Sequence, residues 1–115
     1  MELKAVRCQP CHKGSEPVSA GDTELHLEQL PDWQKHNVDS EERLTRTFSF
    51  KHYQDGLDFA LAVGALAEAE NHHPLMTVAW GAVTISWWTH SIGGLHLNDF
   101  IMAARTDALY EGTGC

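Results

Sequence analysis

The feature of this sequence that most constrains its fold is a change of hydrophobic period near residue 51. Apolar and polar side chains alternate from Leu44 to Phe50, which is typical of a β-strand with one buried face. The next segment, Tyr53 to Glu70, repeats apolar residues at helical spacing and predicts an amphipathic helix. Pro74 cannot continue that helix and disfavours a helical residue before it, so we expect the helix to end at about Asn71.

Five further segments carry helical or strand patterns: a helix at 22–30, strands at 33–38, 77–80 and 83–89, and a helix at 99–109. Residues 39–42 and 81–82 would be the turns of two antiparallel hairpins. The predicted order is therefore α-β-β-α-β-β-α. It indicates an α+β fold in which a four-stranded antiparallel sheet carries three helices packed on one face.

The composition fits one folded domain. The chain has 115 residues, of which 43% are hydrophobic, and this is enough for a single core. We expect the domain at residues 22–110, an N-terminal tail or loosely docked arm at 1–21, and a C-terminal tail at 111–115.

Charge and targeting signals exclude several classes of partner. The chain has 8 basic and 16 acidic residues, and its net charge of −8 argues against binding to nucleic acid or to an anionic membrane surface. The start of the chain lacks the apolar segment of a signal peptide, and the longest apolar run, 59–67, is too short to span a bilayer. The odd number of cysteines, 3, lies near the ends and indicates reduced thiols. We therefore expect a cytoplasmic protein.

Most of the side chains that could carry chemistry lie between residues 68 and 99: Glu68, His72, His73, Pro74, Trp80, His90 and Asp99. Histidine can give and take a proton near neutral pH, so this group favours acid–base chemistry. Glu68 lies four residues before His72, so we expect its carboxylate on the same helical face as that imidazole, where it could orient the ring.

Other interpretations remain open from the residues alone. His72 and His73 could be a helix C-terminal pair that the helix dipole favours. Asp99 could have a structural role at the start of the last helix if His96 caps it. A zinc site is the least favoured interpretation, because Cys8-x-x-Cys11-His12 is only half of a site, and we assign no metal ligand.

The tryptophans also allow two interpretations. Trp33 and Trp80 could stack on a flat heterocycle, although most tryptophans of a small domain simply pack. Trp87 shares a strand face with Val83 and Ile85, so we expect it in the core.

One ordered set of residues resembles the signature of the pterin-4a-carbinolamine dehydratases: Glu68-x-x-x-His72-His73-Pro74, Trp80, Thr89-His90, Gly94-Leu95 and Asp99. The resemblance extends from Trp33 to about Arg105. It implies the same succession of helices and hairpins, assembly as a homodimer or homotetramer, and no need for a metal or an organic cofactor.

The resemblance also implies a function. Such a dehydratase (a hydro-lyase) converts 4a-hydroxytetrahydrobiopterin to quinonoid dihydrobiopterin and so recycles the cofactor of aromatic amino-acid hydroxylases, which suggests a functional link to phenylalanine hydroxylase. Carried over by position, the catalytic residues would be His72, His73 and His90. The residues that bind or orient the pterin substrate would be Glu68, Trp33, Pro74, Trp80 and Asp99.

Two positions depart from the resemblance, and both are at helix starts. His52 stands where many relatives have a capping aspartate, and His96 stands where many have serine or threonine. Two alternative functions stay open: a non-catalytic regulatory or dimerisation module that binds a partner protein, and a dehydratase-like protein that acts on another pterin.

Overall fold

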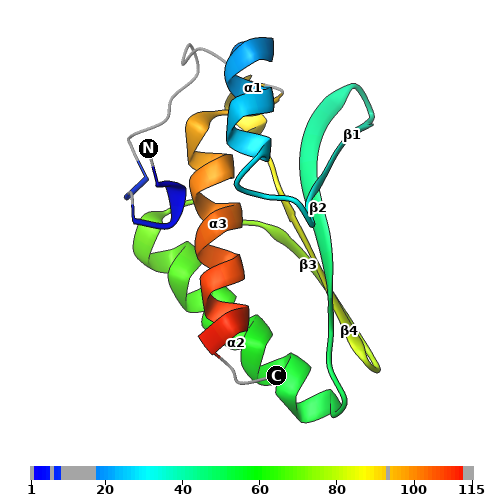
Figure 1. Ribbon diagram of the computed structural model, residues 1–115. Coiled ribbons are helices and arrows are strands. Elements are labelled where there is room, and N and C mark those ends of the chain that lie inside the picture. The colour runs from blue at the N-terminus through cyan, green and yellow to red at the C-terminus, as the bar shows by residue number, and fades with distance from the viewer. Residues whose placement is uncertain (1, 6, 9–17, 93, 113–115) are drawn as a thin grey trace.

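The computed structural model describes residues 2–5, 7–8, 18–92 and 94–112, and of His90 only the backbone (Figure 1). Its elements are a short 3-10 turn η1 (Leu3–Ala5), α1 (Ala20–Leu27), β1 (Gln34–Val38), β2 (Glu41–Ser49), α2 (Tyr53–Glu70), β3 (Leu75–Ala79), β4 (Ala82–Trp87), a second 3-10 turn η2 (His90–Ile92) and α3 (Leu97–Gly112). The predicted α+β class and the order α-β-β-α-β-β-α are confirmed.

The four strands form one antiparallel sheet in the order β1-β2-β4-β3. The two hairpins therefore meet through β2 and β4, with Leu44 opposite Trp87 and Phe48 opposite Val83. These side chains are buried on the face toward the helices. On the other face, hydroxyl pairs cross the same two strands, as between Thr47 and Thr84 at 2.9 Å.

Both hairpin turns differ from those predicted: the first starts at Asp39 as expected but is shorter, and the second lies one residue earlier. Asp39 and Ser40 have positive φ angles of 51° and 68°, and this left-handed pair closes a two-residue turn, so that β2 begins at Glu41. In the second hairpin Gly81 supplies the positive φ, 82°, in the turn Trp80–Gly81, and Ala82 already belongs to β4.

The first and last helices begin earlier than predicted: the cap of the first, Ser19, lies upstream of the residues expected to cap it, and the last begins directly after His96, the cap that the sequence offered. The Ser19 side chain accepts a hydrogen bond from the Asp22 backbone at 3.2 Å, so α1 covers Ala20–Leu27 in place of 22–30. Helix α3 starts at Leu97 instead of residue 99. The bounds of α2, Tyr53–Glu70, are those predicted.

The N-terminal segment contacts both long helices through buried Glu70 at the end of α2. Glu70 accepts hydrogen bonds from Arg7 Nε and from the Cys8 backbone, both at 2.8 Å, and pairs with Arg105 of α3 at 3.0 Å. The hydrogen bonds from Arg7 and Cys8 lower the pKa of Glu70 to about 2. Burial raises the pKa of the Cys8 thiol to about 12, so it stays protonated.

This segment also adds Leu3, which is fully buried, to the core. The limits proposed for the domain and its tails stay predictions, and Cys11 and His12 lie outside the described residues. Among the helices of the described ranges, none has the length and apolar character required to cross a membrane.

Candidate active site

The end of α2 determines where His72 and His73 point. Asn71 adopts the left-handed conformation, with φ 51° and ψ 42°, and the His72 backbone N–H then reaches the Ala67 carbonyl at 3.1 Å. This bond, which spans five residues, is typical of a helix that closes with a left-handed cap. The chain turns sharply at Asn71, so the residues that follow no longer keep the helical spacing to Glu68.

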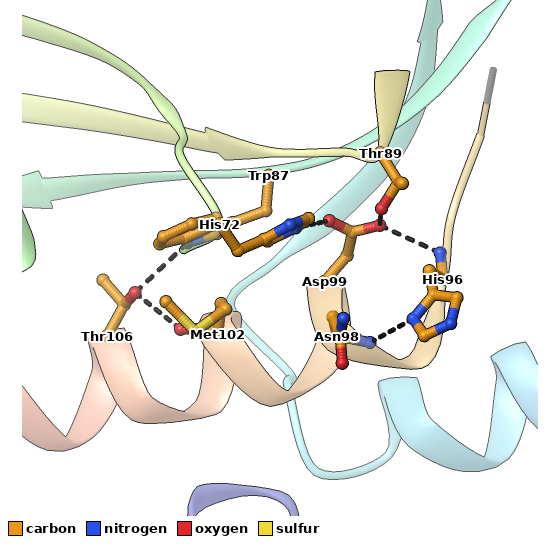
Figure 2. Close-up of polar contacts among 8 residues, drawn as sticks. All are labelled: His72, Trp87, Thr89, His96, Asn98, Asp99, Met102 and Thr106. Carbon is orange, nitrogen blue, oxygen red and sulfur yellow. Dashed lines mark hydrogen bonds and ion pairs between the residues drawn. The ribbon is translucent and has the colours of Figure 1, made fainter. Parts of the chain in front are cut away.

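His72 pairs with Asp99 across the fold (Figure 2). Its Nε2 lies 2.6 Å from Asp99 Oδ1, the His72 side chain is 11% exposed, and the Asp99 side chain is fully buried. A carboxylate can only accept, so Nε2 carries the hydrogen, and Nδ1 is the ring atom left to exchange a proton. The His72 ring also stacks on Trp87, with centroids 5.7 Å apart and planes 7° from parallel. Bond and stack together fix the imidazole in one orientation.

The Asp99 carboxylate is held by three donors. Besides His72, the Thr89 hydroxyl donates to Oδ2 at 2.8 Å and the His96 backbone N–H donates to the same oxygen at 2.9 Å. A buried carboxylate needs such partners to offset the loss of water. The bond from His96 also makes Asp99 part of the N-terminal cap of α3, so the predicted structural role is confirmed and coexists with the contact to His72.

His73 forms a second, more exposed pair. Its Nε2 lies 2.6 Å from Glu68 Oε1, and both side chains are more than half exposed to solvent. The expectation that Glu68 orients His72 is therefore wrong: the left-handed turn at Asn71 brings His73 to Glu68 and leaves His72 to Asp99.

The two tryptophans proposed to bind substrate lie elsewhere. Trp33 is buried and its Nε1 donates to Asp107 at 2.8 Å, eight residues along α3 from Asp99 and therefore roughly 12 Å along the axis. Trp80 is 82% exposed in the β3–β4 turn, separated from His73 by the whole of β3. The structure thus brings neither ring to the His72–Asp99 pair, and their roles in binding stay predictions.

Two other predicted residues flank the site. Pro74 directly precedes β3, where it separates the histidine pair from the sheet. The His90 backbone opens the turn η2 directly beyond Thr89, and its side chain lies outside what the structure describes. In the described ranges, no three His, Cys, Asp or Glu side chains form a group that could hold a metal ion.

The sequence pointed to His96 as the cap before Asp99, but it did not identify Thr89 as a partner of Asp99 or Trp87 as the partner of the His72 ring. The alternation of side chains along β4 was the available signal for Thr89 and Trp87, because Thr89 lies two residues beyond Trp87 and so can point to the same side of the sheet. Burial of Trp87, which is complete, was predicted correctly.

Comparisons with known proteins point to one family. The family model described as pterin 4 alpha carbinolamine dehydratase matches residues 16–109. A protein of Chlorobium limicola is 50% identical over 96% of this chain and 98% of its own, and one of Syntrophotalea carbinolica is 49% identical over 95% and 97%. Both are named provisionally as pterin-4-alpha-carbinolamine dehydratases.

Two solved structures are also similar. The "transcriptional coactivator/pterin dehydratase" of Brucella melitensis has a TM-score of 0.74 and 31% identity and covers 82% of this chain and 98% of its own. A "pterin dehydratase-like protein" described as a RuBisCO assembly factor in the alpha-carboxysome has a TM-score of 0.59 and 26% identity, over 69% and 89%. The family model matches most of this chain, and a relative is identical to it at half of the aligned positions. This chain therefore belongs to the pterin 4 alpha carbinolamine dehydratase family.

Proposed function

We propose that this protein dehydrates 4a-hydroxytetrahydrobiopterin to quinonoid dihydrobiopterin and water. The observation that carries the proposal is the buried pair of His72 and Asp99, in which a fixed imidazole keeps one ring nitrogen available for proton transfer. Membership of the family supplies the substrate class.

The reaction needs only proton transfers. The bond between C4a and the hydroxyl oxygen breaks, the departing hydroxyl takes up a proton and leaves as water, and N5 loses its proton, so nothing is oxidised or reduced. We assign these transfers to His72 and His90, and the holding of the pterin to His73 with Glu68 as its partner. Asp99 keeps His72 in the tautomer with hydrogen on Nε2.

Turnover of the carbinolamine pterin by the purified protein tests the proposal. We expect His72→Ala to lower kcat by roughly 10²- to 10⁴-fold, the usual contribution of a positioned acid or base, and to do so without loss of folding by circular dichroism. His36→Ala is the control, because His36 lies on β1 and pairs with Thr45 on β2. A wild-type protein without turnover, or a His72→Ala variant at the wild-type rate, would contradict the proposal.

We also propose that the protein assembles with copies of itself through α2. A shallow, largely apolar groove runs along this helix and is lined by Gln54, Leu57, Ala60, Leu61, Gly64, Ala65 and Glu68. Leu61 is 74% exposed there, which is unfavourable for a monomer in water. A second α2 of the same chain would cover this face with like residues, as the symmetry of homodimers requires.

The same groove supports the alternative function of binding a partner protein, because one structural neighbour is titled as an assembly factor and another as a coactivator. The turnover experiment separates the two. A folded protein that binds pterin without converting it, or ignores pterin altogether, would favour the binding module.

A further inference from the structure

The start of α3 is capped by a histidine ring. His96 immediately precedes the first helical residue, Leu97, and its Nδ1 accepts a hydrogen bond from the Asn98 backbone N–H at 3.0 Å (Figure 2). Serine, threonine, aspartate and asparagine are the usual residues at this position, and their side-chain oxygens accept such a bond at any pH near neutral.

An imidazole can make this contact in one protonation state only. The bond requires a lone pair on Nδ1, so the ring must be neutral with its hydrogen on Nε2. Protonation would place an N–H on Nδ1 against the Asn98 N–H and add positive charge at the helix end that already carries the positive pole of the dipole. The cap is therefore lost when His96 takes up a proton.

The same cap positions the buried carboxylate. Asn98 and Asp99 are adjacent in the first turn of α3, and the His96 backbone N–H is one of the three donors to Asp99. If the ring leaves Asn98, His96 keeps the bond from the Asp99 backbone N–H to its carbonyl, at 2.9 Å, but loses one of the contacts that fix it at the helix start, so the donor to the Asp99 carboxylate is held less firmly. The carboxylate is then less firmly placed against His72.

We propose that His96 is a positioning residue which holds Asp99 against His72 only while its imidazole is neutral, so that acid loosens the site. The consequence for turnover rests on the proposed function, but the cap itself does not. Nothing in the family resemblance requires it, since many relatives have serine or threonine at this position.

The charged and titratable surroundings of His96 favour the neutral ring. Burial lowers the pKa of His96, the Asp99 carboxylate opposes that change, and His72, from the segment after α2, acts in the same direction as burial. From α1, His26 packs on Phe100 of α3, one residue beyond Asp99. Because the folded-state pKa lies below the ordinary value of 6.5, the unfolded chain binds more protons in this range. The stability that His96 contributes is complete above about pH 6.5 and is lost as the pH falls through the folded-state value.

Melting curves of four proteins test the cap: the wild type, His96→Ser, His96→Ala and the matched control His52→Ser. His52 is also an N-cap histidine, at α2, but its ring makes no capping bond. At about pH 7.5 we expect His96→Ala to lose about 4 °C and His96→Ser to stay near the wild type. Toward pH 5 the wild type should lose more stability relative to His96→Ser than relative to His52→Ser, because only at His96 does protonation break a capping bond.

Ring ¹⁵N spectra and turnover complete the test. The spectra should show Nδ1 of His96 without hydrogen, and in His96→Ala the downfield Nε2–H signal of His72 should weaken or shift. His96→Ala should lower kcat by up to about fivefold with KM nearly unchanged, His96→Ser should restore it, and the ratio of His96→Ser to wild-type kcat/KM should rise in acid.

Two results would overturn the inference: a hydrogen on Nδ1 of His96 at neutral pH, or a stability difference between the wild type and His96→Ser that does not vary with pH. Absence of turnover in all variants would count against the proposed function alone, because the spectra and melting curves still decide whether the cap depends on pH.

Discussion

At the scale of single residues, the site contains two pairs of histidine and carboxylate that differ in burial. His72 and Asp99 are enclosed and supported by further donors, whereas His73 and Glu68 face solvent. Removing a partner from a buried polar network leaves unsatisfied groups, whereas an exposed pair contributes little. The same carboxylate-to-amide substitution in each pair therefore compares the effect of a buried partner with that of an exposed one.

We expect Asp99→Asn to lower both stability and rate. The amide cannot accept from all three donors, so it costs about 1–3 kcal/mol of unfolding free energy and no longer selects the Nε2–H tautomer of His72. In kcat we expect a loss of roughly 10²-fold or more. Urea unfolding and turnover measure the two effects. Glu68→Gln is the control and should change stability by less than about 1 kcal/mol. Equal effects of the two substitutions would contradict the importance of burial.

At the scale of secondary-structure elements, one left-handed residue determines which carboxylate meets which histidine. Asn71 ends α2 with a φ of 51°, and this reversal redirects the next two side chains. Just before it, Glu70 attaches the same helix end to the N-terminal segment and to α3. The end of α2 is thus held by the N-terminal segment and by α3, and this limits the movement of the two histidines that follow it.

Substitutions of Asn71 test this role. Alanine is strained in the left-handed region, so Asn71→Ala should cost about 1–2 kcal/mol, whereas Asn71→Gly should be close to neutral. Because His72 follows directly, we expect kcat to fall in the alanine variant and to remain within a few-fold in the glycine variant. Melting temperature and turnover give the two values. An alanine variant as stable as the wild type would show that the turn is not the constraint.

At the scale of the whole molecule, the exposed face of α2 predicts self-association. Sedimentation at micromolar concentration should detect at least a dimer, and Leu61→Glu should shift the protein toward monomer by placing a charge in the apolar groove. Leu25→Glu is the control, since Leu25 is also exposed but lies on α1. A monomeric wild type, or an equal effect of both variants, would argue against α2 as the interface.

The sequence by itself determined the fold class, the order of the elements and the bounds of α2, because periodicity and the chemistry of proline act over a few residues. It also placed His72 and His73 directly after α2, where the structure has them. The spacing of four residues paired Glu68 with His72 as if both lay on one helix. The left-handed φ of Asn71 turns the chain between them, so that Glu68 meets His73 and His72 meets Asp99.

Only the tertiary structure decided the rest. The strand order β1-β2-β4-β3 sets Trp87 beneath the His72 ring, and the packing of α3 brings Asp99 to an imidazole 27 residues away in the chain. Contacts between distant segments depend on how complete elements pack against each other. No local sequence pattern predicts such contacts. The sequence therefore identifies the candidate histidines, whereas their partners depend on the tertiary structure.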